Sequence, residues 1–347
     1  MARMSTFRPH SPNIVVAAST IRARLATTSR RGPCVRSTTT SLAARPADRN
    51  ACSDVLSSQK RNACSEVVGV AMKTVVITGG TDGMGAALAR HYLREGNQVV
   101  VVGRSRAKFE ALLASLAADG VAATGRASFL AADLSLVAES ERVVEQIRAS
   151  HERIDVLVLA ASFIRQKRHE TAEGHEASWV LFFVSKYILL TGLASLLADS
   201  DRPTVVNTSV PGAKAGAIDF DDLESAQRFS FVRSNAQQRR ANELLGILVT
   251  SDNPALAYIT WGPRRLVRTS LAGDVGRAMK IASVLLGAVA GQRPDDAIAP
   301  IITFVADPPA GRAAYRGATQ VALVQGPHDT DDARRLAAET TALVTGR

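Results

Sequence analysis

Three glycines near the start of a strand-to-helix pattern have the spacing of a phosphate-binding turn. The segment TVVITGGTDGMGAALARHYLREG (74–96) runs from an apolar stretch through Gly79, Gly83 and Gly85 into a helix-like stretch. Glycine lets the backbone turn sharply and approach phosphate oxygens without a Cβ clash. The first turn of the following helix offers free N–H groups and a dipole that favours an anion. The spacing predicts a dinucleotide-binding turn, and an ordinary strand-to-helix turn is the alternative.

Short apolar runs alternate with helix-like segments from Lys73 onward. Apolar strands that alternate with helices predict a parallel sheet covered by helices on both faces. We therefore expect an α/β fold with a single doubly wound parallel sheet. The expected strands are 74–78, 98–103, 127–132, 155–161, 204–209, 256–260 and 319–324, and the expected helices are 86–96, 106–120, 139–151, 174–198 and one from about 235, with a less regular region up to about 310.

The positive charge of the chain is concentrated near its N-terminus. Residues 1–70 carry 11 Lys/Arg against 3 Asp/Glu, whereas the rest of the chain carries 31 against 29. The net charge of +10 therefore predicts no nucleic-acid-binding surface on the body of the protein. We divide the chain into a basic Ser/Arg-rich extension, 1–71, and a folded domain, 72–347. The extension is interpreted as disordered or as a mispredicted start, with an organelle transit peptide and a functional basic tail as alternatives.

The cysteines narrow the chemistry of the folded domain. Cys34, Cys52 and Cys64 all lie in the extension. Neither disulfides, nor a cysteine nucleophile, nor thiolate metal ligands are therefore expected in 72–347. The histidines are scattered without metal-ligand spacing, so no metal site is predicted.

One segment is apolar enough to raise the question of a membrane. The stretch WVLFFVSKYILLTGLASLLA (179–198) has the length of a membrane span but carries Lys186 in its middle. A lysine at that depth is costly, so we predict a buried helix of a soluble core and no membrane association. The expected location is cytoplasmic, or an organelle if 1–71 is a transit peptide.

The glycine turn and its neighbours resemble the short-chain dehydrogenase/reductase family. The resemblance covers about 73–330 and rests on the T-G-x-x-x-G-x-G spacing from Thr78 to Gly85 and on the segment AADLS around Asp133. It implies a Rossmann-type fold, a nicotinamide dinucleotide cofactor and a small-molecule substrate. It also implies that Asp133 contacts the adenine amine of the cofactor.

The end of the second expected strand bears on the choice of cofactor. Gly103 stands where family members that prefer NAD carry an acidic residue, and Arg104 and Ser105 follow it. A carboxylate would bind the ribose 2′-OH, whereas an arginine suits a 2′-phosphate, so NADP(H) is favoured over NAD(H). The alternative for Arg104 is a solvated residue at a strand end. The cofactor-binding residues implied by the resemblance are Thr78, Gly79, Gly80, Thr81, Asp82, Gly83, Met84, Gly85, Arg104, Ser105, Asp133, Leu134, Ala160, Ala161, Arg239 and Thr269.

Two other family motifs are altered. The strand that usually ends in Asn-Asn-Ala-Gly here ends in residues 159–162, LAAS, so only Ala161 is retained and both asparagines are lost. The later nicotinamide loop keeps Thr269 but has Arg264 and Arg265 at the Pro-Gly spacing. We expect this arginine pair to face water, and contact with an acidic substrate is the alternative.

The catalytic set of the family is replaced at each of its four positions. Family members use a Ser, a Tyr and a Lys supported by an Asn. Aligning the Ala-Asn at 241–242 on the family's motif places Asn235 at the Tyr and Arg239 at the Lys. Val210 then stands at the Ser, and Phe182 near the Asn. An amide does not exchange protons near neutral pH and an arginine stays protonated, so the usual acid/base groups are absent.

Other groups could supply a proton, and each has a structural alternative. Ser209 and Tyr187 are weak catalytic candidates, and Tyr187 is expected in the core. His175 is expected at a helix start on the surface. Tyr258 and the acids of DFDDLE (219–224) complete the set, and Asp221 and Asp222 are typical of turns or caps. No G-x-S-x-G nucleophile motif occurs.

Two functions follow from these patterns. The first is an NADPH-dependent oxidoreductase that acts on a carbonyl, an alcohol or an activated double bond with a non-standard acid/base arrangement. The second is a non-catalytic dinucleotide-binding sensor or partner subunit. The helix at VLFFVSKYILL (180–190) lies where family members often form a helical dimer contact, so the resemblance implies a homodimer or homotetramer.

Overall fold

The computed structural model describes residues 72–214, 216–265, 267, 273–274 and 291–346. The predictions for the extension 1–71, with its three cysteines, and for Thr269 lie outside these residues.

The described strands form one large, mostly parallel sheet with the order β10-β9-β7-β6-β4-β1-β2-β3. Its strands pair in parallel except for β9 with β10. This arrangement confirms the predicted α/β fold. The strands are β1 (Thr74–Thr78), β2 (Gln98–Gly103), β3 (Ala127–Ala131), β4 (Val156–Leu159), β6 (Thr204–Asn207), β7 (Ala257–Gly262), β9 (Arg312–Arg316) and β10 (Thr319–Val321), and β5 (Ile164–Arg165) pairs separately with β8 (Gly273–Asp274).

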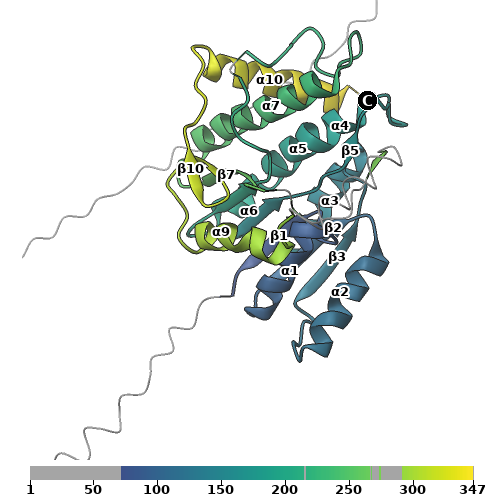
Figure 1. Ribbon diagram of the computed structural model, residues 1–347, viewed down its shortest axis with the longest axis vertical. Coiled ribbons are helices and arrows are strands. Elements are labelled where there is room, and N and C mark those ends of the chain that lie inside the picture. Colours follow the sequence, from purple (N-terminus) through teal and green to yellow (C-terminus); the bar gives the residue numbers. More distant parts are fainter. Residues whose placement is uncertain (1–71, 215, 266, 268–272, 275–290, 347) are drawn as a thin grey trace, which may run out of the picture. The chain divides into compact units, whose positions relative to one another are not determined.

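Helices cover both faces of the sheet (Figure 1). Alternate residues of β1 point to opposite faces: Val75 and Ile77 pack with α1, α2 and α9, whereas Val76 packs with α3, α5 and α7. Apolar side chains on both faces are what a doubly covered parallel sheet requires. The helices are α1 (Gly83–Arg94), α2 (Arg106–Ala118), α3 (Val137–Ser150), α4 (Ala177–Trp179), the π-helix η1 (Val180–Val184), α5 (Ser185–Gly192), α6 (Ala194–Ala198), α7 (Phe231–Asp252), α9 (Pro294–Ala306) and α10 (Asp329–Thr345).

The strand order places a crevice between β1 and β4. Strand β1 pairs with β2 on one side and with β4 on the other, so the chain connections run in opposite directions from this point. Loops at the carboxyl ends of such neighbouring strands diverge and leave room for a ligand. The loops that follow Thr78 and Leu159 are therefore positioned to form a site.

The sequence-based prediction was wrong in the C-terminal part of the sheet and at the start of α7. Helix α9 (Pro294–Ala306) lies where an irregular region was expected, and strand β9 (Arg312–Arg316) was not predicted. The strand expected at 319–324 is β10, a short antiparallel edge strand that ends at Val321. Arginines at both ends of β9 hide the apolar pattern of its three central residues. Helix α7 begins at Phe231 rather than near 235, and its first turn carries the exposed Phe231 and Val232, which show no amphipathic pattern.

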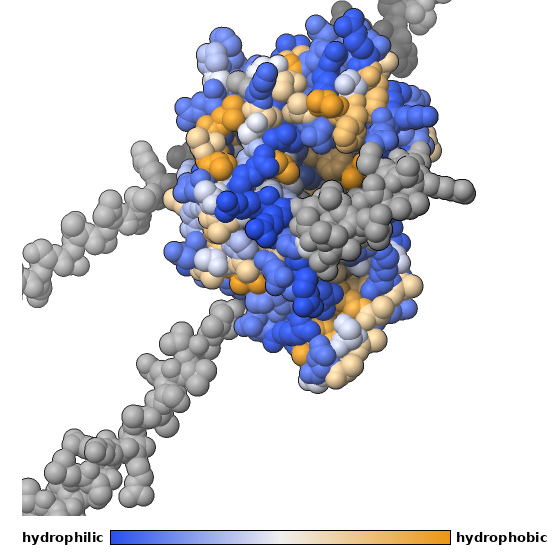
Figure 2. Space-filling model, in the orientation of Figure 1, coloured by the Kyte–Doolittle hydropathy of each residue, from blue (hydrophilic) through white to orange (hydrophobic). Residues whose placement is uncertain are grey.

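The apolar segment 174–198 is a buried helical stretch interrupted by a π-helix. Its central residues Val180, Phe183 and Leu189 are buried in the core. No helix within the described part of the chain is long and apolar enough to cross a membrane. On the face drawn in Figure 2, hydrophobic residues form separate patches among hydrophilic ones.

Helix α10 covers part of the helical layer in which a dimer contact was expected. It packs along α7, and the Tyr187 hydroxyl of α5 lies 2.8 Å from Thr341 Oγ1 of α10. The apolar residues of 180–190 are thus largely used within the chain. The predicted homodimer or homotetramer stays a prediction, and these residues alone do not support it.

The glycine turn is closed by two backbone approaches. Gly79 has a φ of +68°, and a Cβ there would lie 2.7 Å from the Cα of Ala161. A Cβ on Gly85 would lie 2.3 Å from the carbonyl oxygen of Gly79. Both positions require glycine, because backbone atoms cannot move aside as a flexible side chain does. The start of α1 is thus held tightly against the end of β1.

The substitution Gly85→Ala tests this packing. Overpacking a backbone contact costs about 1–3 kcal/mol. The free energy of unfolding should fall by this amount, and the midpoint of urea unfolding should fall with it. Gly216→Ala is the control, because a Cβ at Gly216 meets nothing within 4 Å. Equal stability of the two variants in the full-length chain would contradict the close approach.

Candidate functional site

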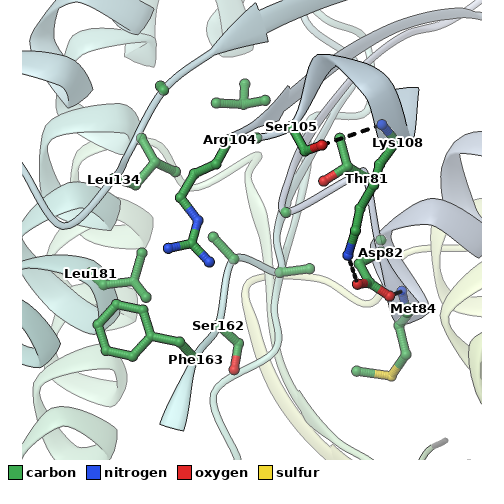
Figure 3. Close-up of a pocket in the computed structure, with 18 of the residues that line it drawn as sticks. Thr81, Asp82, Met84, Arg104, Ser105, Lys108, Leu134, Ser162, Phe163 and Leu181 are labelled. Carbon is green, nitrogen blue, oxygen red and sulfur yellow. Dashed lines mark hydrogen bonds and ion pairs between the residues drawn. The ribbon is translucent and has the colours of Figure 1, made fainter. Parts of the chain in front are cut away.

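A cavity of about 540 Å³ lies at the carboxyl ends of β1, β2 and β4 (Figure 3). The glycine turn forms one wall, the end of β2 a second and the loop after β4 a third. The volume falls in the range of small-molecule and cofactor sites. Of the residues predicted to bind the cofactor, the cavity is lined by Gly79, Thr81, Asp82, Gly83, Met84, Gly85, Arg104, Ser105, Asp133, Leu134, Ala160 and Ala161.

The first turn of α1 forms part of this wall. Asp82 is its N-cap, and the carboxylate accepts a 2.7 Å hydrogen bond from the Gly83 N–H. The other carboxylate oxygen pairs with Lys108 of α2, which also lines the cavity and was not predicted. A helix N-terminus with an ammonium group beside it attracts an anion. The turn can therefore hold a diphosphate.

Arg104 leaves the end of β2 and extends into the cavity. Figure 3 shows its guanidinium group pointing toward the side lined by Leu134 and Ser162. No ion pair is found for Arg104 in the described part of the chain. Ser105 caps α2, accepting from the Lys108 N–H at 3.3 Å. The end of β2 thus presents the cationic side chain of Arg104 to the cavity.

Three of the residues predicted to bind the cofactor do not line this cavity. The Thr78 hydroxyl accepts from the N–H groups of Ala160 and Ala161 at 3.0 and 3.2 Å, and so joins the glycine turn to the loop after β4. Gly80 packs against Val101, because a Cβ there would lie 3.0 Å from Val101 Cγ1. Arg239 lines a different cavity.

A second cavity, of about 510 Å³, adjoins the first. The two share the wall formed by Met84, residues 160–164 and Pro263. The positions that align with the family's catalytic set, Phe182, Val210, Asn235 and Arg239, all line the second cavity, together with Ser209. The alignment therefore brings together residues that are also close in space, although none of the four carries a group that titrates near neutral pH.

Arg239 holds the loop after β6 through hydrogen bonds to its backbone. Its Nε donates to the Val210 carbonyl at 2.6 Å and its Nη2 to the Pro211 carbonyl at 2.8 Å. Arg316 of β9 also donates to the Pro211 carbonyl, at 3.3 Å. Burial, and then the nearby charge of Arg316, lower the pKa of Arg239 from its ordinary value. The position of the family's lysine is thus occupied by a cation that holds the backbone.

Most of the other suggested proton donors lie away from both cavities. Tyr187 faces α10, and the His175 ring lies 3.0 Å from Glu224. Asp222 caps a turn, as predicted, by accepting from the Ala226 N–H at 2.6 Å. Tyr258 is fully buried, and burial raises the pKa of its phenol well above the ordinary value. Arg264 and Arg265 are exposed and do not line the cavity, in agreement with the prediction that they face water.

The sequence-based prediction missed Lys186, which lines the second cavity from α5. Its side chain is buried, and its ammonium group donates a 2.8 Å hydrogen bond to Asn207 Oδ1. Burial without a carboxylate partner lowers the pKa of Lys186 from 10.5 to about 7. A single lysine in an otherwise apolar helix was the indication available in the sequence.

A buried amide network fixes the position of Lys186. Asn207 Nδ2 donates to Asn242 Oδ1 at 2.6 Å and to the Tyr258 hydroxyl at 2.7 Å. Asn242 Nδ2 in turn donates to the Phe182 carbonyl at 2.8 Å, within the π-helix. Because every amide atom has a partner, Asn207 has one favourable orientation, with its oxygen toward Lys186.

The described residues hold no group of three His, Cys, Asp or Glu side chains that could bind a metal ion. The side chains that could take part in chemistry in the second cavity are therefore one buried amine, arginines, amides and the hydroxyl groups of serines and Thr208, among them Ser209. Among these the amine of Lys186 is the group that changes protonation near neutral pH.

Comparison with known proteins agrees with this geometry. The family model for short chain dehydrogenase matches residues 73–220. Polyprenol dehydrogenase of Homo sapiens is 24% identical over 232 residues, which cover 65% of this chain and 69% of that protein. Retinol dehydrogenase 14 of Homo sapiens is 28% identical over 183 residues, 50% of this chain and about half, 54%, of that protein.

A solved structure shows the same fold. An alcohol dehydrogenase from the archaeon Thermococcus sibiricus, complexed with 5-hydroxy-NADP, superposes with a TM-score of 0.50 at 18% identity. The superposition covers 72% of this chain and 99% of that chain. At this identity the likeness concerns the fold.

The variant Lys186→Met tests the state of the buried amine. The folded chain disfavours the ammonium form, so between pH 7 and 10.5 the unfolded chain binds more protons and stability rises with pH. Removing the amine should stabilise the full-length chain by on the order of a few kcal/mol at pH 6, and the gain should shrink toward pH 10. Urea unfolding at several pH values measures this.

Lys167→Met is the control for this variant, because Lys167 is exposed. It should change the unfolding free energy little at any pH. If Lys186→Met lowers the free energy of unfolding by the same amount at pH 6 and at pH 10, the pKa of Lys186 is not lowered in the folded chain.

Proposed function

We propose that this chain, which belongs to the short-chain dehydrogenase/reductase family, is an NADP(H)-dependent oxidoreductase that acts on a carbonyl, an alcohol or an activated double bond. The observation that carries this proposal is the adjacency of two cavities. One has a glycine turn and a helix N-terminus, and the other has a buried amine. Such a pair suits a dinucleotide next to a small-molecule substrate.

The first cavity suits a nicotinamide dinucleotide. A Cβ at Gly79 or Gly85 would clash with the backbone. Because both residues are glycines, the turn has no side chains at these positions beside the first N–H groups of α1. Asp133 and Leu134 line the side where adenine would lie. When bound, the cofactor supplies or accepts the hydride.

A preference for NADP(H) is supported by the charges at the end of β2. Arg104 and Lys108 line the cavity there, and the residue before Arg104 is a glycine where an acid would favour NAD(H). The similar alcohol dehydrogenase from Thermococcus sibiricus is complexed with an NADP derivative, which agrees with this choice.

Lys186 is proposed as the proton donor and acceptor. In the reduction of a carbonyl, its ammonium group would give a proton to the substrate oxygen as the hydride reaches the carbon. In the reverse direction, its neutral amine would take that proton from the alcohol. Asn207 holds the amine in place, and a pKa of about 7 suits transfer in both directions near neutral pH.

A non-catalytic dinucleotide-binding protein is the second candidate. It is favoured by the replacement of the family's acid/base groups by Val210 and Asn235, and by Arg239, whose guanidinium group is engaged with two backbone carbonyls. A sensor or partner subunit would keep the first cavity and need no proton donor. Turnover separates the two candidates.

We also propose that the chain assembles as a homodimer or homotetramer, as the resemblance implies. Light scattering of the full-length chain tests this, and a strictly monomeric particle would count against it. A cytoplasmic location is proposed, with an organelle as the alternative, because the choice depends on residues 1–71.

The cofactor proposal predicts the effect of Arg104→Ala. Loss of a charge-assisted contact with the 2′-phosphate should weaken NADPH binding by about 1.5–3 kcal/mol, roughly ten- to a hundredfold, and leave NADH binding nearly unchanged. Titration of the full-length chain with each nucleotide, followed by nicotinamide fluorescence, measures both affinities. Arg106→Ala is the matched control, because Arg106 stacks on Phe129 and does not line the cavity. If the wild-type chain binds neither nucleotide, the oxidoreductase proposal is wrong.

The proton-transfer proposal predicts that Lys186→Met binds NADPH with an affinity within about twofold of the wild type. With a carbonyl compound that the wild type reduces, the variant should oxidise NADPH about 10²–10⁴-fold more slowly. Lys186→Arg should be similarly slow, because arginine stays protonated. Wild-type reduction should decline as the pH rises through about 7, since the ammonium form of Lys186 is lost. Full activity of either variant would assign the proton to another group.

A further inference from the structure

The second cavity has an unbalanced set of charges. Four cationic side chains line it, namely Arg165 of β5, Lys186 of α5, Arg239 of α7 and Arg316 of β9. Among the described residues, its lining contains no Asp, Glu or His. The four cations come from elements far apart in the sequence, so the fold, and not a local charge run, brings them together.

Within the described residues, these cations have no carboxylate as an ion-pair partner. No ion pair within 4.0 Å is found for any of the four in the described portion of the chain. Burial lowers the pKa of Arg239, and the charge of Glu243 partly opposes this effect. The carboxylate of Glu243, however, accepts hydrogen bonds from the Gly212 and Ala213 N–H groups and pairs with Arg240. Like charges held together in a partly buried cavity repel one another, and an anion would relieve that repulsion.

The arginines also keep hydrogen-bond donors that the protein does not use. Arg239 and Arg316 both donate to the Pro211 carbonyl. The hydrogen bonds found for them use Nε and Nη2 of Arg239 and Nη2 of Arg316, which are three of the six guanidinium nitrogens. Arg165 stacks on the Phe163 ring at 4.8 Å, and its buried Nε has no hydrogen-bond partner among the residues that the structure describes. A buried donor without a partner is costly unless a ligand satisfies it. Guanidinium groups fit the oxygens of carboxylates and phosphates in pairs.

The lining of the cavity also contains uncharged polar residues and a group of aromatic ones. Phe163, Phe182, Phe229 and Phe231 line it, and the ring of Phe231 is partly open to solvent, with 43% of the residue exposed. Aromatic rings bind the hydrocarbon part of a ligand. A ligand that matches both the phenylalanines and the cations therefore has an apolar body and one anionic group.

We infer that the second cavity binds an organic anion, with a carboxylate or phosphate group held by Arg165, Arg239 and Arg316 and an apolar body against the phenylalanines. The anion is the substrate if the proposed function holds, and that part of the inference rests on the proposed function. The binding of an anion does not rest on it, because the cations are present whatever reaction takes place.

Four ligands with the same body and different charge test this inference. They are 4-phenylbutanoate, 4-phenylbutyl phosphate, 4-phenylbutan-1-ol and 4-phenylbutylamine, titrated by calorimetry into the full-length chain at low salt, with and without NADP⁺. At least one anion should bind about tenfold or more tightly than the alcohol, and the ammonium compound should bind least well. Comparison of the two anions distinguishes a carboxylate site from a phosphate site.

Two variants and a control locate the anion. Arg316→Gln lies on an exposed strand end and should fold, and it should lower the preference for the anion over the alcohol about three- to tenfold. Arg239→Gln should lower it further but also loosens the loop after β6, so its unfolding curve is recorded as well. Arg264→Gln removes an exposed charge outside the cavity and should leave the preference unchanged.

The outcomes separate this inference from the proposed function. Equal affinity for the alcohol and both anions, or an unchanged preference in Arg316→Gln, overturns the anion site even if NADPH binds and is oxidised. A clear anion preference that Arg316→Gln reduces, in a chain that binds neither NADPH nor NADH, supports the anion site and overturns the oxidoreductase proposal.

Discussion

The buried side chain of Asn207 is the interaction on which the arrangement of the second cavity depends. Its oxygen accepts from Lys186 and from the Ser209 N–H, and its nitrogen donates to Asn242 and Tyr258. One amide thereby joins β6, α5, α7 and β7. Because all four contacts are buried, breaking any of them leaves a polar group without water, which makes the network cooperative. The amine of Lys186 can be buried without a carboxylate because this amide orients toward it.

The two cavities differ in how they attract negative charge. The first uses a helix N-terminus with Lys108 and Arg104 at its rim, where exposed side chains can adjust to a ligand. The second uses partly buried cations among aromatic rings, where the dielectric is lower and a charge has more effect. A dinucleotide suits the former and a smaller amphipathic anion the latter. Their shared wall, formed by Met84 and residues 160–164, would bring the reacting parts of both ligands together.

The four positions that align with the family's catalytic set carry other residues without a change of fold. Arg239 aligns with the family's lysine, yet it holds the carbonyls of Val210 and Pro211, so it stabilises a loop that borders the second cavity. The amine in this cavity comes from α5 instead. The similarity to human polyprenol dehydrogenase and retinol dehydrogenase 14 extends over only part of those proteins, and the second cavity is defined by residues of this chain.

Local patterns of residues were enough to predict part of this protein. The strands 74–78 and 98–103 coincide with β1 and β2, since unbroken apolar runs bounded by turn residues leave little choice, and the spacing of Gly79, Gly83 and Gly85 located the turn that lines the first cavity. The second cavity depends instead on contacts between elements that are distant in the sequence. Lys186, Asn207 and Arg316 lie far apart along the chain, and each alone is typical of a helix, a strand end or a surface. Their chemistry arises from burial and from partners on other elements, which no local pattern encodes.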